Sequence, residues 1–186
     1  MTFNETPLKN AFVIDLEPQA DERGFFARIW CERESAMQGL EPHLVQSSIV
    51  YNARKHTLRG MHYQVAPHGE VKVVRCTRGA LFDVILDLRP DSPTFLKHWN
   101  IELSARNRRA LYIPPGFAQG YQTLEDDTDV LYQMSEFYVP EAQRGVRWND
   151  PAFRIEWPSA ERRTISPRDD AYGDFDLEAF LRGHVQ

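Results

Sequence analysis

Short runs of strand-forming residues recur along most of the chain, and this spacing constrains the fold more than any other feature of the sequence. The runs are rich in Val, Ile, Leu, Phe and Tyr, and Gly, Pro and Asp turns such as Pro114-Pro115-Gly116 separate them. Short strands at regular spacing favour an antiparallel β-sandwich or barrel over alternating βαβ units. We expect strands at residues 44–45, 49–51, 59–64, 71–76, 80–88, 95–103, 110–113, 119–124 and 129–134.

The segments on either side of this block are less regular. Strands are expected at residues 11–16 and 25–30, followed by a helix over 32–39 that Gly39 would stop. After Pro140 the strand pattern loosens, and a small helix is expected at 176–182. We see no repeat and no linker, so the sequence predicts one all-β domain over residues 1–186. It would carry a few short helices and an irregular C-terminal cover from about residue 140.

Composition narrows the classes of function. The net charge of −5 argues against a general nucleic-acid binder, which needs a basic surface. Cys31 and Cys76 are far apart and lack metal-type spacing, so two reduced thiols are expected. No run reaches the roughly 20 apolar residues of a membrane helix, and the first residues do not look like a signal peptide. We therefore expect a soluble, cytoplasmic protein with no nucleic-acid or membrane partner.

The chemistry-bearing residues concentrate at Arg59-Gly60-Met61-His62-Tyr63-Gln64, with Lys72 shortly after. Arg59, His62 and Lys72 offer two cations and a proton acceptor in a short span. If these strands line a cavity, the set suits an anionic ligand and the movement of a proton. A histidine in a strand is more often structural or exposed than catalytic, so the motif alone leaves both interpretations open.

The sequence disfavours a metal site of the kind found in cupin-type β-barrels. That pattern needs a His-x-His pair, a later Glu, and another His after a Pro-x-Gly turn. Here the corresponding residues are His62, Gln64, Glu70 and Gln119. One imidazole and one carboxylate are too few for tight divalent binding, and His68 lies in a loop with no sign of rigid placement. We expect neither a metal nor another cofactor.

Several motifs in order resemble one known family. They are Asp21–Phe26, Leu58–Gln64, Lys72–Arg75, Phe82–Arg89, Asp91–Phe95, Ile113–Ala118, Trp148–Pro151, Ile155–Pro158 and Ile165–Asp169. Over about residues 11 to 170 the chain is similar to the dTDP-4-dehydrorhamnose 3,5-epimerase family of nucleotide-sugar enzymes. The resemblance implies a cupin-like jelly roll, a nucleotide-sugar substrate, no cofactor, and a homodimer in which N-terminal strands cross the interface.

The resemblance also implies a mechanism. The family's substrates are 4-keto-6-deoxy sugars, in which C3 and C5 lie next to the ketone and can lose a proton to give an enolate. By resemblance His62 is the base, Asp169 its carboxylate partner, Lys72 the cation near the developing oxyanion, and Tyr132 the acid on the opposite face.

Further positions match substrate contacts of the family. Arg23 and Arg59 resemble the diphosphate and sugar contacts, for which the planar guanidinium is suited. Gln46 matches a polar contact, Tyr138 the aromatic residue that stacks on the nucleotide base, and Arg168 a basic ligand contact.

Asp83 resembles a supporting acid near Lys72. Three positions at the substrate contacts depart from the family pattern. Gln119 stands where the family usually has His, Arg28 where it has Glu, and Ser48 where it has Asn. A neutral amide can donate a hydrogen bond but cannot carry a proton or a charge. Epimerisation at C3 or C5 alone, a 3,4-ketoisomerase acting on another nucleotide sugar, and a non-catalytic nucleotide-sugar binding protein therefore stay open as alternatives.

Overall fold

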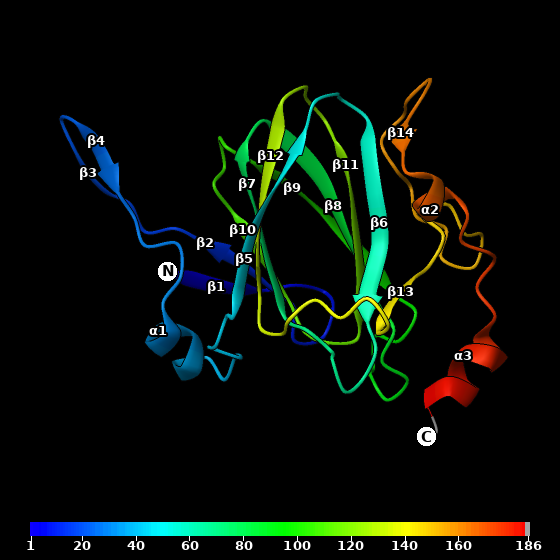
Figure 1. Cartoon of the computed structure of the whole chain (residues 1–186). Coiled ribbons are helices and arrows are strands. Elements are labelled where there is room, and N and C mark those ends of the chain that lie inside the picture. Colours follow the sequence, from blue (N-terminus) through cyan, green and yellow to red (C-terminus); the bar gives the residue numbers. More distant parts are fainter. Residues whose placement is uncertain (185–186) are drawn as a thin grey trace.

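The computed structural model describes residues 1–184 and shows two antiparallel β-sheets packed face to face (Figure 1). The first sheet contains, in spatial order, β1 (Thr2–Glu5), β2 (Phe12–Asp15), β10 (Ala110–Ile113), β7 (Lys72–Arg78), β12 (Thr128–Met134) and β5 (Gln46–Asn52). The second contains β13 (Gln143–Gly145), β6 (Thr57–Gln64), β11 (Phe117–Thr123), β8 (Ala80–Asp87) and β9 (His98–Ser104), with β14 (Thr164–Ile165) pairing parallel to β6. The predicted all-β sandwich is confirmed.

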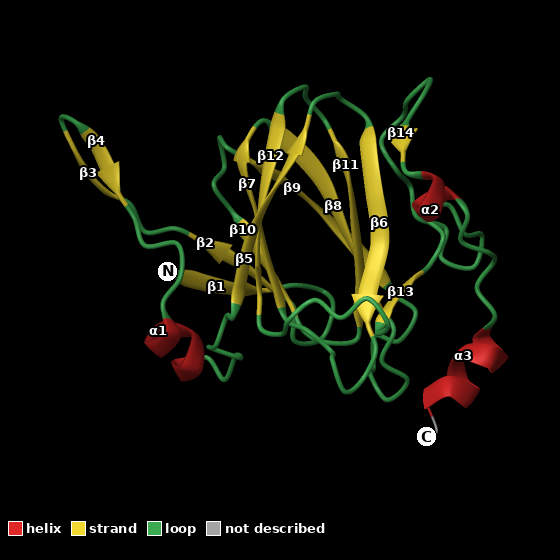
Figure 2. Cartoon of the chain, viewed as in Figure 1, coloured by secondary structure: helices red, strands yellow, loops and turns green. Residues whose placement is uncertain are grey.

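The remaining elements surround this sandwich (Figure 2). A separate hairpin, β3 (Gln19–Asp21) and β4 (Gly24–Phe26), projects from the body at the left of Figure 1. The helices are short, as predicted: α1 (Glu32–Met37), α2 (Pro167–Asp170) and α3 (Leu177–His184). None of the helices in the described residues is long and apolar enough to cross a membrane.

The hydrophobic core lies between the sheets, and two further apolar layers cover their outer faces. Because side chains alternate along a strand, Val74 and Cys76 of β7 enter the inner core while Val73 packs outward. The N-terminal segments around α1 cover the first sheet, and the C-terminal segment covers the second through residues such as Phe153 and Phe175. Both faces of the central strands are buried, which explains why their sequences read as almost continuous apolar runs.

Several predicted boundaries were wrong. The strand expected at 25–30 ends at Phe26, in a hairpin whose Phe25 and Phe26 are exposed. The strand expected from residue 95 begins at His98, because the backbone turns at Leu96 with φ of 60°. Residues 44–45 form no strand, although the Val45 amide donates to the carbonyl of Met134. The sequence did not predict β1, β3, β13, β14 and α2, which are at most four residues long.

At Gly60 the backbone of β6 lies close against the backbone of β11 in the second sheet. Its φ is 115°, and a Cβ added there would lie 2.6 Å from the Cα of Gly120 and 2.8 Å from the Gln119 carbonyl oxygen. Both the space and the backbone conformation therefore require glycine at this position of β6.

We predict that Gly60→Ala lowers the free energy of unfolding by about 3 kcal/mol, because the methyl group must displace backbone atoms of β11. Urea titration followed by circular dichroism measures this change. Gly183→Ala is the matched control: a Cβ there meets nothing within 4 Å among residues 1–184, so a change below about 1 kcal/mol is expected. Equal midpoints for the two variants would contradict the steric argument.

Candidate active site

Strand periodicity places several polar side chains on the inner faces of the sandwich. In β8, Leu81 and Ile85 belong to the inner core, so Asp83 between them points the same way. The same alternation brings inward His62 of β6, Lys72 of β7, Gln119 of β11 and Tyr132 of β12. Polar residues within core-facing strands mark this region as a site rather than as packing.

These side chains meet at a cavity of about 290 Å³. It is bounded by both sheets and by the C-terminal segment around α2. All the residues predicted to be catalytic line it, namely His62, Lys72, Tyr132 and Asp169, and so do Arg59, Gln119 and Arg168 from the predicted binding set.

The His62 imidazole is held by a buried carboxylate. Nε2 of His62 lies 2.7 Å from Oδ1 of Asp169, and Oδ2 of Asp169 accepts a 3.1 Å hydrogen bond from the Gly60 amide. Burial alone would raise the pKa of Asp169, but the hydrogen bond and charge of His62 and the Gly60 amide outweigh burial and lower it. Asp169 therefore stays ionised and can stabilise a positively charged imidazole.

The position of Asp169 follows from a short local signal. Ser166 caps the first turn of α2, its Oγ accepting from the Asp169 amide at 3.1 Å, and Pro167 occupies the first helical position. The Ser-Pro pair is a helix-start signal in the sequence that would have predicted α2.

Lys72, on the opposite sheet from His62, lies beside the His62–Asp169 pair. Its Nζ donates to the carbonyl oxygen of His62 at 3.1 Å and lies 3.2 Å from Oε1 of Glu70. Glu70 in turn accepts from Nε2 of Gln64 at 3.2 Å. The ammonium group is thus buried, paired and held at one place in the cavity.

Tyr132 faces the cavity from the first sheet, whereas His62 faces it from the second. Its hydroxyl donates to Oε1 of Gln119 at 3.2 Å, and Nε2 of Gln119 donates to Oδ1 of Asp83 at 2.7 Å. Burial raises the pKa of Tyr132 well above its ordinary value. The phenol is therefore protonated at neutral pH and can serve as a proton donor.

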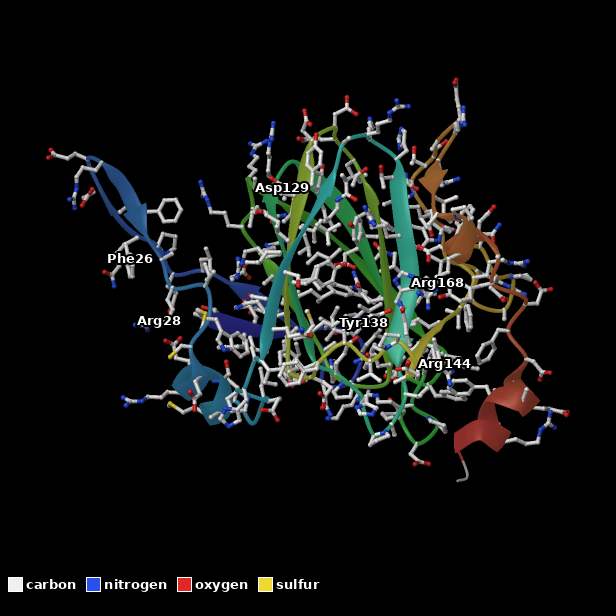
Figure 3. All side chains as sticks on the ribbon, in the orientation of Figure 1. Phe26, Arg28, Asp129, Tyr138, Arg144 and Arg168 are labelled. Atoms are coloured by element: carbon white, nitrogen blue, oxygen red, sulfur yellow. The ribbon has the colours of Figure 1, made fainter. Side chains whose placement is uncertain are left out.

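Three predicted binding residues lie beside the cavity rather than in its wall. Oε1 of Gln46 accepts from the Tyr138 amide at 2.9 Å, and the Tyr138 ring is half exposed. Figure 3 shows Tyr138 near Arg168, and a hydrogen bond between these side chains raises the pKa of Arg168. Ser48 is exposed and is the register partner of Tyr132 on β5.

Arg23 and Arg28 are not brought to this cavity within one chain. Arg23 pairs with Asp21 in the projecting hairpin at 2.5 Å, and Arg28 pairs with Glu34 at 2.7 Å. Figure 3 places Arg28 on the far side of the molecule from Tyr138 and Arg168.

Other residues near the His62–Asp169 pair were not predicted from the sequence. The Tyr172 ring lies edge-on to the His62 ring with centroids 6.4 Å apart, and Gln143 lines the cavity. Asn52 connects Arg59 to Tyr121, accepting from the Arg59 Nε at 2.9 Å and from the Tyr121 hydroxyl at 3.1 Å. No sequence signal for Tyr172 is evident, because its place depends on how the C-terminal segment packs.

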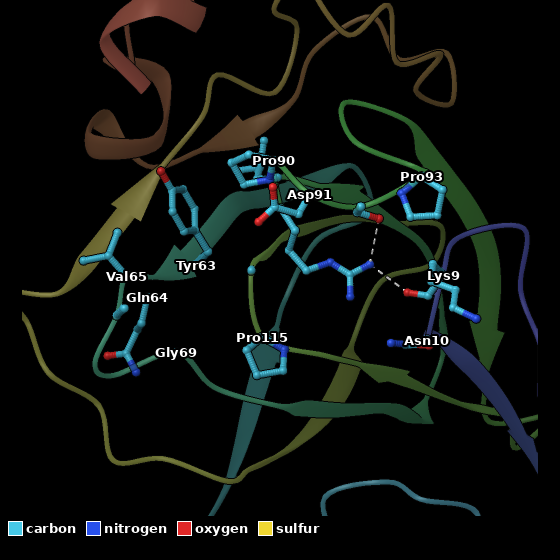
Figure 4. Close-up of a pocket in the computed structure, with 15 residues that line it drawn as sticks. Lys9, Asn10, Tyr63, Gln64, Val65, Gly69, Pro90, Asp91, Pro93 and Pro115 are labelled. Carbon is cyan, nitrogen blue, oxygen red and sulfur yellow. Dashed lines mark hydrogen bonds between the residues drawn. The ribbon is translucent and has the colours of Figure 1, made fainter. Parts of the chain in front are cut away.

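A larger cavity of about 550 Å³ lies elsewhere (Figure 4). Its walls include Pro90, Pro93 and Pro115, and its guanidinium group, from Arg89, is bound to Asp87. It holds none of the predicted catalytic residues, so size does not identify the site. Within residues 1–184, no three His, Cys, Asp or Glu side chains gather in a way that could hold a metal ion.

A carboxylate-held imidazole, an ammonium group and a protonated phenol around one cavity can remove a proton and return one from the other side. This combination defines an acid–base isomerase on a β-sandwich. The model of the family described as dTDP-4-dehydrorhamnose 3,5-epimerase matches residues 5–176. The chain belongs to this family and is an isomerase, so the family prediction is confirmed.

Individual relatives agree with this membership. The chain is 38% identical to a dTDP-4-dehydrorhamnose 3,5-epimerase of Sinorhizobium fredii, covering 91% of this chain and 87% of the relative. It resembles the crystal structure of the Bacillus anthracis enzyme with TDP and PPi bound, with a TM-score of 0.89, 35% identity and coverage of 94% and 99%. The likeness to these structures confirms the predicted cupin-like fold.

The same fold also occurs in a mono-epimerase. The chain resembles ChmJ, a 3'-monoepimerase from Streptomyces bikiniensis in complex with dTDP-quinovose, with a TM-score of 0.87 and 26% identity. The match covers 98% of this chain and 91% of ChmJ. Fold alone therefore does not decide how many carbons are inverted.

We predict that Asp83 makes stability depend on pH. Burial raises its pKa from 3.8 to about 7, despite the opposing hydrogen bond from Gln119. The raised pKa means that protonated Asp83 stabilises the fold fully below about pH 4, and this contribution is lost as pH rises through about 7. The free energy of unfolding of Asp83→Asn, minus that of the unmodified protein, should therefore increase over this range.

Urea unfolding at a series of pH values measures this difference. Asp129→Asn is the matched control, because Asp129 lies at the far end of β12 from the cavity. A difference for Asp83→Asn that stays constant with pH would contradict the raised pKa.

Proposed function

We propose that this chain epimerises C3 and C5 of a dTDP-linked 4-keto-6-deoxy sugar, with His62 as base and Tyr132 as acid. The observation that carries the proposal is that His62 and Tyr132 come from opposite sheets and line the same cavity. Inversion at carbon requires that the proton leaves from one face and returns to the other. A sandwich with one group on each inner face meets that requirement.

The steps follow from these positions. The His62 imidazole takes the proton next to the C4 ketone, and the bonding electrons move into the carbonyl to give an enolate oxygen. Lys72 stabilises this oxyanion, while ionised Asp169 stabilises the imidazolium. The Tyr132 O–H bond then breaks, its proton bonds to carbon from the opposite side, and the C4 carbonyl forms again. Tyr132 is left as a phenolate and regains a proton from solvent, and the His62 imidazolium releases to solvent the proton that it took.

The nucleotide end of the substrate would extend from the cavity past Arg59 and Arg168 toward Tyr138. Arg59 and Arg168 line the cavity, and the exposed Tyr138 ring lies near Arg168. Two guanidinium groups suit a diphosphate, and an exposed aromatic ring suits stacking with a base. We assign Gln46 to holding the Tyr138 backbone, since its amide oxygen accepts from the Tyr138 N–H.

We further propose a homodimer in which the β3–β4 hairpin reaches a second copy of the chain. The hairpin projects from the body, and Phe26, the last residue of β4, is 68% exposed. Arg23 and Arg28, which do not reach their own cavity, would then act at the partner's site. The exposed Ile49 and Tyr51 of β5, at the edge of the first sheet, offer further apolar surface for the contact.

The role of His62 is tested with His62→Asn. Incorporation of deuterium from D2O into dTDP-4-keto-6-deoxyglucose should fall by at least about 10²-fold, because the proton acceptor is removed. Affinity for dTDP, measured by calorimetry, should stay unchanged. His43→Asn, at an exposed position outside the cavity, is the control and should exchange normally. If exchange survives in His62→Asn, another group is the base.

The same assay separates the full epimerase from the alternatives. Deuterium at both C3 and C5 is expected, whereas deuterium at only one carbon would indicate a mono-epimerase. Gln119 is the reason to consider a mono-epimerase, because it lies beside Tyr132 at a position where the family usually has a titratable histidine. Binding of dTDP without any incorporation of deuterium would indicate a non-catalytic nucleotide-sugar binding protein.

The dimer is tested by light scattering after size-exclusion chromatography. We expect twice the mass of the chain, and we expect Phe26→Asp to shift the protein toward the monomer, because a carboxylate would enter an apolar contact. Met37→Asp, on an even more exposed apolar side chain of α1, is the control and should leave the mass unchanged. A monomeric unmodified protein would refute the dimer.

A further inference from the structure

Asp83, Gln119 and Tyr132 form one chain of hydrogen bonds from the core to the cavity. Nε2 of Gln119 donates to Oδ1 of Asp83 at 2.7 Å, and Oε1 of Gln119 accepts from the Tyr132 hydroxyl at 3.2 Å. Asp83 is fully buried, and its Oδ2 has no hydrogen-bond partner among residues 1–184. Asp83 itself does not line the cavity, so it can act only through Gln119.

The two ends of the Gln119 side chain differ, and the charge on Asp83 selects between them. An ionised carboxylate only accepts hydrogen bonds, so it must face the amide NH2 and leave the amide oxygen facing Tyr132. In that state Tyr132 has to donate its proton to Gln119. A phenolate at Tyr132 would then meet the amide oxygen, which repels it.

Protonation of Asp83 removes this requirement. Its O–H can donate to the Gln119 amide oxygen, so the amide can turn over and present its NH2 group to Tyr132. The NH2 group would then donate to the phenolate oxygen that forms when Tyr132 gives up its proton.

We propose that Asp83 and Gln119 are positioning residues that control the acid step: neutral Asp83 turns the Gln119 amide so that it supports the Tyr132 phenolate, and ionised Asp83 turns it the other way. The inference rests on the proposed role of Tyr132 as the acid. It concerns this chain in particular, because an imidazole at residue 119 would itself titrate whereas the amide cannot.

The surroundings of Asp83 place this switch near neutral pH. Lys72 from β7 favours the ionised form of Asp83, while Tyr121 from β11 and Tyr132 from β12 are buried phenols close enough for Asp83 to raise their pKa. The charge of Arg59 from β6 opposes the rise in the pKa of both phenols. The β9 residue opposite Asp83 is the apolar Ile101. Burial outweighs the favourable contacts, so both forms of Asp83 are accessible.

The amide itself provides a readout that does not depend on catalysis. In the unmodified protein, the side-chain NH2 resonances of Gln119 in a ¹⁵N–¹H NMR spectrum should shift with an apparent midpoint near neutral pH. In Asp83→Asn they should not titrate with this midpoint, because residue 83 then stays neutral. Gln119 resonances that titrate equally in both proteins would overturn the inference, even if the proposed reaction is correct.

The rate of deuterium incorporation supplies the catalytic readout. The ratio of the rate at about pH 9 to the rate at about pH 7 should be about tenfold higher in Asp83→Asn than in the unmodified protein, because the variant keeps a neutral group at residue 83. A variant that only perturbed packing would lower the rate without changing this ratio. Asp129→Asn is the control and should keep the unmodified ratio.

Gln119→Met covers the case in which Asp83→Asn does not fold. Methionine is similar in length but neither donates nor accepts strongly, so the link to Asp83 is cut. The rate should fall about tenfold near pH 7, and the decline at alkaline pH should disappear. A decline that persists in Gln119→Met would overturn the inference. Absence of any exchange in the unmodified protein would instead reject the proposed function.

Discussion

The arrangement of the site depends on one carboxylate that joins two distant parts of the chain. Asp169 lies on α2 in the C-terminal segment, yet its two oxygens bind the His62 ring and the Gly60 amide on β6. The segment that covers the second sheet therefore also supplies the carboxylate that pairs with His62. The close backbone contact that requires glycine at residue 60 leaves the Gly60 N–H directed to Asp169, so packing of β6 on β11 and orientation of the base are parts of one constraint.

A sandwich suits chemistry that needs groups on two faces of a substrate. Each sheet contributes one wall, and alternation along the strands decides which side chains enter the space between them. The proposed base, His62, comes from one wall and the proposed acid, Tyr132, from the other, while Lys72 comes from the same sheet as Tyr132. The same alternation fills the rest of the interior with Val, Ile and Leu, so the rigid core fixes the reacting groups at the edge of the cavity.

Much of the fold was predictable because strand periodicity and turn residues are local signals. They identified the central strands, and His62 and Lys72 were recognisable within them. The pairing of His62 with Asp169 was not visible in strand patterns, since it spans 107 residues and depends on the packing of α2. The strand expected at 25–30 failed for a related reason: Phe25 and Phe26 look like core residues, but they lie in the projecting hairpin, where both remain exposed in the described part of the chain.

Gln119 shows how a single departure from a family pattern can change which residue responds to pH, while the proposed base and acid stay in place. A histidine beside Tyr132 could respond to pH by its own titration, whereas an amide takes the orientation that its neighbours impose. In this chain the neighbour that can change its charge is Asp83, one strand away and fully buried. Burying a carboxyl group with one oxygen unpartnered opposes ionisation, which is the property that lets it change state near neutral pH. The residue that we propose to control the acid step is thus outside the cavity, on β8.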